Sequence, residues 1–469
     1  MRWVDLTAID WLVLARHELL LFAATFFLIG ALDEIAVDLA WLWLRMRGRG
    51  RTERIVEADA LDRPLTGPAA VLIPTWREEA VIAATIEHAL RVWPHDDLRV
   101  YVGCYANDPL TPAAAIGGAG GDPRLRVVVH DVAGPTCKAD CLNRLYGALL
   151  ADEAREGFAA RMVLLHDAED MVDPAALALL DEAIQNAAFV QLPVLALPDP
   201  RSPLVAGHYA DEFAEAHGKA MVVRSALGQG IPGAGVGCAV ARAWLARLDV
   251  QRDGAGPFAT GSLTEDYELG LQIAAMGGKA RFLRARTMEG RLIATRSYFP
   301  HSMRTAIRQK TRWLHGIALQ GWDRLGWRGS PVALWMQLRD RRGPLAALLL
   351  ALAYVLLAIA AAEWALGRIG VVAAAVPLSP AMRLLLWCNL LALAWRLAAR
   401  FAFTTREFGV FQGLLSVPRV IVSNTVAIVA ARRALFGYVR SLRGERTIWD
   451  KTEHIRHPAL LSAPRDLAA

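Results

Sequence analysis

Two acidic side chains separated by one small residue offer the clearest chemistry in this sequence. Asp167 and Glu169 follow the short apolar run Met162–Leu165, which is the pattern of a buried strand. Carboxylates two residues apart at a strand end can share one divalent cation, and Mg²⁺ or Mn²⁺ in turn holds a diphosphate. The alternative is a solvated loop in which Asp173, before Pro174, caps the next helix. Because that cap leaves Asp167 and Glu169 without a structural role, the pattern favours a metal site.

A second acidic group, Thr264-Glu265-Asp266, precedes the helical pattern Tyr267–Met276. A carboxylate at a helix start can act as a general base if it reaches a substrate hydroxyl. Ser262 with Glu265 also fits a capping box, in which two side chains satisfy the free amides of the first helical turn. From the spacing alone, capping is the stronger interpretation.

The third group, Gln309, Arg312 and Trp313, shares one face of a predicted helix. It offers an amide, a guanidinium that can bind phosphate and a ring that can stack. The alternative is an amphipathic helix that rests on a membrane with Trp313 at the interface. Both descriptions can hold for the same helix.

Short β-branched runs alternate with helical patterns between residues 69 and 328, which indicates an α/β domain with a mostly parallel sheet. Ligands of such sheets gather beyond the carboxyl ends of the strands, and the polar groups lie at those ends. Glu78 and Asp108 follow the first two runs, although a helix start and a turn explain each of them separately. The predicted strands are Ala69–Ile73, Arg99–Cys104, Leu125–His130, Met162–Leu165 and Ala188–Leu192, and the predicted helices include Glu78–Trp93 and Lys138–Ala151.

The composition is too apolar for a simple soluble enzyme and too charged for an all-helical transporter. Of the 469 residues, 55% are hydrophobic and 21% are charged, which suits a soluble domain joined to membrane spans and excludes a disordered or fibrous chain. The net charge of +6 comes from arginines beside the apolar segments, which favours membrane topology over nucleic-acid binding. The five cysteines lack metal-binding spacing, which predicts a reduced cytosolic domain.

Three apolar blocks, Trp11–Leu32, Pro344–Ala362 and Leu384–Phe403, are predicted to span the membrane. The arginines beside them place the central domain in the cytosol. A fourth block, Val410–Ala431, contains Pro418 and is predicted to be an interfacial or re-entrant helix. The predicted division is 1–44 membrane anchor, 45–68 basic linker, 69–328 cytosolic α/β domain, 329–436 transmembrane and interfacial helices, and 437–469 cytosolic basic tail.

The order of these motifs resembles that of family 2 glycosyltransferases with a GT-A fold. The polysaccharide synthases of that family carry an early Asp, a D-x-D, a T-E-D and a Q-x-x-R-W, matched here at 108, 167–169, 264–266 and 309–313. Glu169 departs from the usual Asp but keeps its charge. Lys138-Ala139-Asp140 followed by Leu142-Asn143 is similar to the family's K-A-x-x-L-N element. The runs at 105–108, 209–213 and 449–454 further resemble the bacteriophage adsorption protein B type of inner-membrane glycosyltransferase.

The resemblance implies an inverting transfer of a hexosyl or N-acetylhexosaminyl group from a UDP-sugar to a growing exopolysaccharide at the bacterial inner membrane. It implies that Asp266 is the catalytic base, that Glu78 and Asp108 hold the uridine, that Lys138 and Arg312 contact the diphosphate, that Asp167 and Glu169 hold Mg²⁺ or Mn²⁺, and that Glu265, Gln309 and Trp313 bind the acceptor. The expected partners are the UDP-sugar donor, the glycan acceptor, the lipid bilayer and an outer-membrane export partner, with no nucleic acid.

Two alternatives stay open: a non-processive enzyme that glycosylates a lipid carrier, and an inactive scaffold or phage-entry receptor. In the resembling synthases the Q-x-x-R-W set accompanies repeated addition, which favours a polymerase. Arg419, Ser423 and Asn424 could give the block Val410–Ala431 the polar lining of a sugar path. The alternative is that Asn424 caps a surface helix.

Overall fold

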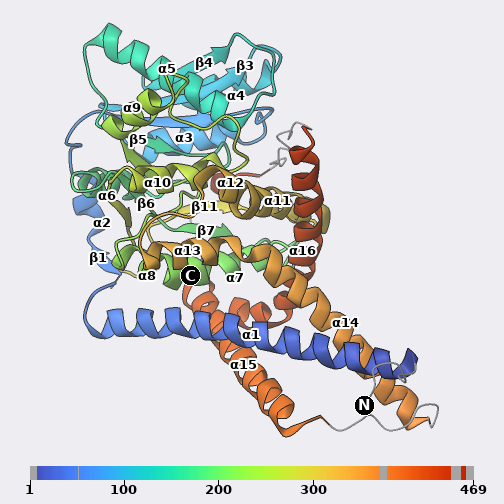
Figure 1. The fold of residues 1–469 in the computed structure, drawn as a ribbon. Helices are drawn as coiled ribbons and strands as arrows, with labels where there is room; N and C mark the ends of the chain where they lie inside the picture. The colour runs from blue at the N-terminus through green and yellow to red at the C-terminus, as the bar shows by residue number, and fades with distance from the viewer. Residues whose placement is uncertain (1–7, 51, 370–377, 445–455, 461–469) are drawn as a thin grey trace.

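A seven-stranded β-sheet forms the centre of the domain that follows the first helix in the computed structural model (Figure 1). The structure describes residues 8–50, 52–369, 378–444 and 456–460. The strands of this sheet lie in the order β4-β3-β2-β5-β8-β6-β9. Their bounds are β2 (Ala69–Pro74), β3 (Leu98–Tyr105), β4 (Leu125–His130), β5 (Met162–Leu165), β6 (Phe189–Gln191), β8 (Cys238–Ala241) and β9 (Ala280–Phe282).

Four of the six pairings between neighbouring strands are parallel, and β8 runs antiparallel to both of its neighbours. The predicted α/β domain with a mostly parallel sheet is therefore confirmed. All five predicted strands form, and the run Ala188–Leu192 is shortened to Phe189–Gln191. Strands β3 and β4 lie on one side of β2, whereas β5 lies on the other. The topology therefore switches between β2 and β5, which is where ligands of such sheets bind.

Helices cover both faces of the sheet. Alternate residues of β2 pack into two different hydrophobic clusters, Val71 and Ile73 in one and Ala70 and Leu72 in the other, because successive side chains of a strand point to opposite faces. The helices of the first face are α3 (Ile82–Val92), α4 (Leu110–Ala119) and α6 (Ala176–Ile184), and those of the second are α5 (Lys138–Glu156), α9 (Arg242–Gln251) and α10 (Glu265–Ala275).

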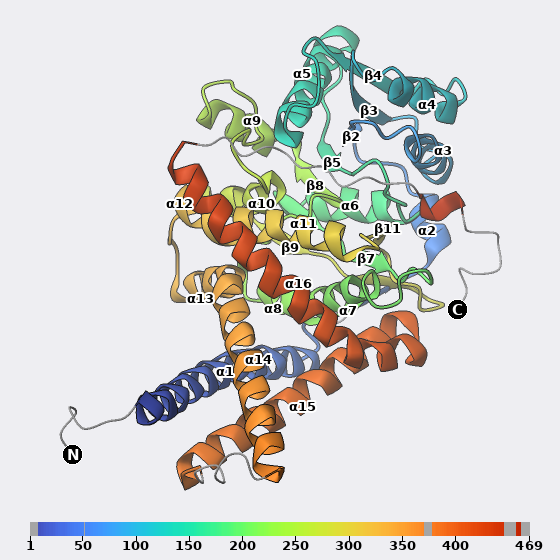
Figure 2. The same cartoon turned by 90° about the vertical axis from the view of Figure 1, so that its right-hand side faces the viewer.

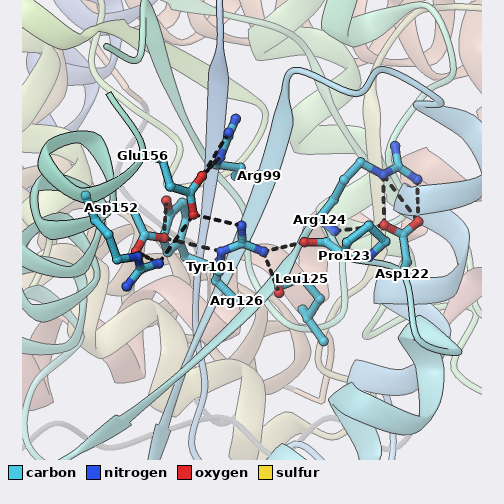
Figure 3. Close-up of polar contacts among 10 residues, drawn as sticks. Arg99, Tyr101, Asp122, Pro123, Arg124, Leu125, Arg126, Asp152 and Glu156 are labelled. Atoms are coloured by element: carbon cyan, nitrogen blue, oxygen red, sulfur yellow. Dashed lines mark hydrogen bonds and ion pairs between the residues drawn. The ribbon is translucent and has the colours of Figure 1, made fainter. Parts of the chain in front are cut away.

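An ion-pair network ties the edge strand β4 to β3 and α5 (Figure 3). Arg126 Nε lies 3.3 Å from Asp152 Oδ2, and Arg99 Nη2 lies 3.0 Å from Glu156 Oε2. The Tyr101 hydroxyl donates to Asp152 at 3.0 Å, and burial together with this bond raises the pKa of Tyr101. These residues lie near the amino ends of the strands, away from the carboxyl ends where a ligand would bind. The network therefore stabilises the outermost strand β4 and takes no part in the ligand site.

In the described ranges, four helices are long and apolar enough to cross a membrane. The first continues past the predicted span end at Leu32, and its acidic residues Asp33 and Glu34 pair with Arg339 and Arg342. The second half of this helix is therefore held to the segment at 339–342 by ion pairs that no sequence motif predicts. The four helices are α1 (Ala8–Met46), α14 (Gly343–Arg368), α15 (Pro380–Phe408) and α16 (Val410–Leu442).

Helix α16 is unbroken and lies alongside the α/β domain, as Figure 2 shows. Its Arg419 is buried and donates to Asp211 Oδ1 at 2.9 Å, so this arginine is used for docking and does not line a sugar path. Asn424 lies in the middle of the helix and donates to the Tyr354 hydroxyl at 3.1 Å, so the capping alternative is wrong. The interfacial placement of α16 stays a prediction.

Part of the predicted linker at 45–68 is folded against the domain. Strand β1 pairs in parallel with β10, and β7 pairs in parallel with β11. The remaining elements are β1 (Glu53–Ile55), α2 (Glu57–Leu61), β7 (Val194–Leu197), α7 (Gly207–Glu215), the π-helix η2 (Ala216–Ala220), α8 (Met221–Ala226), β10 (Ala285–Thr287), β11 (Thr295–Tyr298), α11 (Met303–Trp313), the π-helix η3 (Leu314–Gln320), α12 (Gly321–Leu325), α13 (Pro331–Arg341) and the 3₁₀ helix η4 (Pro458–Leu460).

Candidate active site

The loop after β5 presents Asp167 and Glu169 at the switch point of the sheet. Ala168 between them is buried, and its carbonyl oxygen accepts a hydrogen bond from Thr85 Oγ1. The two flanking carboxylates are partly exposed. Lys138, the first residue of α5, places its Nζ 2.5 Å from Asp167 Oδ1. The loop therefore presents two carboxylates, one of which lies beside the positive charge of Lys138.

These residues fit a hard divalent cation by the chemistry of their donor atoms. Within the described ranges, no group of three or more His, Cys, Asp or Glu side chains is arranged to hold a metal ion. A cation held by Asp167 and Glu169 would therefore take further oxygen ligands from a bound diphosphate and from water.

A histidine from the far end of the chain supports this loop. Asp170 Oδ2 accepts the amide of Asp167 at 2.9 Å and lies 3.1 Å from His166 Nδ1. His457 Nδ1 accepts the amide of Ala459 at 3.1 Å, so its Nε2 carries the proton and donates to the Asp170 carbonyl at 3.1 Å. Burial lowers the pKa of His457 to about 4, so it is neutral at physiological pH. No sequence pattern identified His457.

Asp266 lies opposite this loop, in a space that two glycines leave open. A Cβ atom at Gly235, where φ is +79°, would lie 2.4 Å from Asp266 Oδ2 and 3.4 Å from Lys138 Nζ. A Cβ atom at Gly233 would lie 2.5 Å from the Asp266 carbonyl oxygen. The glycine-rich run at 228–237 was not assigned from the sequence, although its repeated glycines are the signal of a close backbone approach.

The charges of this cluster are strongly coupled. Burial, followed by the neighbouring Asp266, raises the pKa of Glu265 to about 7. Burial also raises the pKa of Asp266, against the opposing effect of Lys138. Burial would lower the pKa of Lys138, but Asp167, Glu265 and Asp266 outweigh it and raise that pKa above its ordinary value. The lysine is therefore charged, and both acids hold a proton more readily than exposed carboxyl groups do.

The predicted capping box is wrong. Helix α10 begins at Glu265, and its N-cap residue Thr264 makes no side-chain capping bond. Ser262 Oγ instead donates to Glu268 Oε1 at 2.6 Å and accepts the Thr264 amide at 3.2 Å. Because Glu265 is the first helical residue rather than the third, its carboxylate cannot reach back to complete the box. Asp266 Oδ1 accepts the amide of Tyr267 at 2.8 Å.

The helix α11 brings the third motif to the same region. The charge of Arg312 favours the ionised forms of both Glu265 and Asp266. Just beyond α11, Gln320 Oε1 accepts the amide of Leu263 at 3.1 Å, which docks η3 on the loop before α10. Gln309 Oε1 is buried and has no hydrogen-bond partner among the described residues.

Trp313 lies at the end of α11, partly exposed, in an aromatic cluster. Its ring centroid lies 6.0 Å from that of Tyr209 and 6.4 Å from that of Phe299. Lys310 Nζ lies 4.6 Å from the Trp313 ring and pairs with Glu212. The position of the Trp313 ring is thus fixed by contacts with α7, directly through Tyr209 and through the ion pair of Lys310 with Glu212.

Glu78 and Asp108 meet at the ends of β2 and β3. Thr111 Oγ1 accepts the amide of Glu78 at 2.9 Å and donates to Asp108 Oδ2 at 2.7 Å. Asp108 Oδ2 also accepts a hydrogen bond from the amide of Arg77. Arg77 has a φ of 52°, which is not helical, so the helix predicted to start at Glu78 begins only at Ile82. Both acids are buried in this cluster.

The prediction that Asp173 caps a helix holds only in part. Asp173 Oδ1 accepts the amide of Ala175 at 3.2 Å, but the N-cap residue of α6 is Ala175. Asp173 Oδ2 is buried between Arg291 and Arg296. Its main role is therefore this ion pair, which joins the loop to β11.

The mostly parallel sheet, together with a match to a known family, identifies a glycosyltransferase domain of the GT-A type. Residues 67–316 match the family model described as glycosyltransferase like family 2, and the chain belongs to that family. The match covers the segment from β2 to η3, so it includes every residue of the candidate site.

The chain is also similar to two relatives from Escherichia coli, bacteriophage adsorption protein B of strain K12 and bacteriophage N4 adsorption protein B of O157:H7. Each is 32% identical over 459 residues, which is 92% of this chain and 61% of the relative. The chain therefore spans about three fifths of the length of these relatives.

Among solved structures, a mannosyltransferase of Pyrobaculum calidifontis in complex with GDP-Man and Mn²⁺ has a TM-score of 0.47 at 18% identity, covering 88% of this chain and 99% of its own. Glucosyl-3-phosphoglycerate synthase of Mycobacterium tuberculosis has a TM-score of 0.36 at 19% identity, covering 60% of this chain and 89% of its own.

Proposed function

We propose that this protein is an inverting glycosyltransferase that moves a hexosyl or N-acetylhexosaminyl group from a UDP-sugar to a growing exopolysaccharide. The observation that carries the proposal is the convergence of Lys138, Asp167, Glu265 and Asp266 at the switch point of the sheet. Four residues from three separate motifs form one charged cluster there, and membership of glycosyltransferase family 2 supplies the reaction class.

In this mechanism Asp266 is the general base. An acceptor hydroxyl attacks the anomeric carbon as its proton passes to the Asp266 carboxylate, and the bond from that carbon to the UDP oxygen breaks. Attack from the face opposite the leaving UDP inverts the anomeric configuration. Burial raises the pKa of Asp266, which makes its carboxylate a stronger base toward a sugar hydroxyl.

Lys138 and Arg312 hold the donor diphosphate. Lys138 pairs with Asp167, and in the proposed mechanism its ammonium group would turn from this carboxylate to the phosphate oxygens of the donor. Asp167 and Glu169 would hold Mg²⁺ or Mn²⁺, which supplies positive charge against the negative charge that develops on the leaving UDP. Glu78 and Asp108 hold the uridine at the ends of β2 and β3.

Glu265, Gln309 and Trp313 bind the acceptor. The unpartnered Gln309 Oε1 supports this assignment, because a buried acceptor atom needs a hydrogen-bond donor and a sugar hydroxyl can supply it. The partly exposed ring of Trp313, held by its aromatic neighbours, offers a flat face to a sugar.

The proposed location is the bacterial inner membrane, with several spans and a cytosolic catalytic domain. The four apolar helices and the arginines beside them support this topology. An outer-membrane export partner stays a prediction of the resemblance.

The test is to incubate membranes that contain the protein with radiolabelled UDP-hexoses and UDP-N-acetylhexosamines in Mg²⁺ or Mn²⁺, and to size the products. Long products from one donor are expected. Uniform products of one added sugar would instead identify a non-processive enzyme acting on a carrier. Absence of both transfer and donor hydrolysis would favour a scaffold and overturn the proposal.

A further inference from the structure

A basic groove of about 1180 Å³ lies between α8, α10 and β9 on one side and α12 and α13 on the other. Among the described residues that line it, no side chain is acidic. Its basic lining residues are Arg224, Arg252, Lys279, Arg281, Arg324, Arg328 and Arg341. None of these residues belongs to the proposed active site.

Ion pairs neutralise only part of this charge. Arg224 pairs with Asp340, Arg281 with Glu53 and Arg324 with Glu268. The other four basic residues have no ion pair among the described residues, and Lys279 and Arg328 are exposed to solvent. The groove therefore carries a net positive charge that its own walls do not balance.

The guanidinium of Arg341 is held in a fixed orientation by its neighbours. The residue is 6% exposed, and its Nη1 donates to the Gly326 carbonyl at 2.6 Å while its guanidinium stacks 4.7 Å from the Trp327 ring. Its Nε and Nη2 atoms are buried, and neither has a hydrogen-bond partner within the part of the chain that the structure describes. These two donors lie on the same edge of the guanidinium plane, which is the fork that receives two oxygens of one phosphate group.

The groove also lies at the junction with the membrane helices. Arg341 is the last residue of α13, and α14 begins at Gly343. The residues on either side of this turn face α1, because Arg339 and Arg342 pair with Asp33 and Glu34. Arg341 is thus the arginine of this turn that lines the groove.

We propose that the groove binds a phosphate group, with the Arg341 fork as its central contact and Lys279 and Arg328 at its mouth. The phosphate belongs either to the headgroup of an anionic phospholipid or to a soluble phosphate compound. This site is separate from the proposed donor site, and phosphate binding there is a property in addition to the proposed transferase activity.

The test uses the full chain in EDTA, so that a metal-dependent donor site stays empty. One arm measures phospholipid binding by native mass spectrometry after exposure to phosphatidylglycerol or to phosphatidylcholine. The other arm titrates inorganic pyrophosphate into protein in a neutral detergent, by calorimetry. The variants are Arg341→Lys, which keeps the charge but removes the fork, and the surface double variant Lys279→Ser with Arg328→Ser.

At least one probe, phosphatidylglycerol or pyrophosphate, is expected to bind, and both variants should weaken its binding about tenfold. The exposed Arg155→Ala on α5 is the matched control and should leave binding unchanged. Asp167→Ala should also leave it unchanged, which separates this site from the donor site. Binding of neither probe, or equal binding by the wild type and both variants, would overturn the proposal.

Discussion

Asp266→Asn is the substitution that isolates the proposed base. Asp266 Oδ1 accepts the Tyr267 amide at 2.8 Å, and the Oδ1 atom of asparagine can keep that bond. The side chains have nearly the same size, so the space beside Gly235 is still filled without a clash. What the substitution removes is the ability of the Oδ2 position to accept a proton from a sugar hydroxyl.

The expected loss is set by the contribution of a general base. Such groups contribute about 10²–10⁴-fold to the rate, which is about 2.7–5.4 kcal/mol of activation free energy. The rate of sugar transfer should fall by this factor, while the affinity for UDP changes little, because Lys138, Arg312 and the carboxylates of the β5 loop are retained.

The assay compares transfer of a radiolabelled sugar with calorimetric UDP binding in the same preparations. Asp340→Asn is a matched control, because Asp340 also contacts α10, through the Tyr267 hydroxyl at 3.0 Å, but lies outside the site. Near-normal transfer by Asp266→Asn would refute the base assignment. Equal losses in both variants, with a lowered Tm, would show that Asp266 acts only on the fold.

Four further outcomes are expected. Asp167→Ala should abolish the part of UDP binding that depends on Mn²⁺, and excess EDTA should do the same to the wild type; calorimetry showing unchanged affinity in either case would contradict the metal site. Gly235→Ala should reduce transfer at least tenfold and destabilise the fold by about 1 kcal/mol, because its Cβ atom would displace Asp266 and its φ is positive; a variant with wild-type transfer and Tm would disprove the close packing. Trp313→Ala should shorten the product while UDP release by hydrolysis continues, as sized by gel filtration of labelled glycan; products of unchanged length would remove Trp313 from acceptor binding. The pKa of Glu265 is raised from 4.5 to about 7 in the folded state, so between these pH values the folded protein binds a proton that the unfolded chain has lost, and Tm should fall as the pH rises from 4.5 through 7. Glu265→Gln has no such proton to lose and should show a smaller fall in Tm. Equal pH profiles of Tm for the variant and the wild type would contradict the raised pKa.

The sheet was predictable because its strands are short apolar runs with polar or turn residues at their ends. The bounds of Leu125–His130 and Met162–Leu165 agree with the structure to the residue. The start of α3 was not predictable, because it depends on the positive φ of Arg77 and on its contact with Asp108, 31 residues away.

The candidate site was predictable as a set of motifs but not as an arrangement. The sequence alone favoured a capping role for Glu265, and only the resemblance joined Asp266 to Lys138. The capping box failed because the helix begins at Glu265, two residues later than a box with Ser262 as its N-cap requires. The contacts of His457 and Arg419 could not be predicted, since their partners Asp170 and Asp211 lie more than 200 residues away along the chain.

The measurement that tests the central claim most directly is a cryo-electron microscopy structure of the full chain with UDP and Mn²⁺. The account predicts one Mn²⁺ held by Asp167 and Glu169, with the diphosphate between that ion and the side chains of Lys138 and Arg312. It also predicts that the Lys138–Asp167 ion pair is replaced and that Asp266 faces open space beyond the diphosphate. UDP bound elsewhere, or bound with the Lys138–Asp167 pair intact and no metal between the carboxylates, would contradict it.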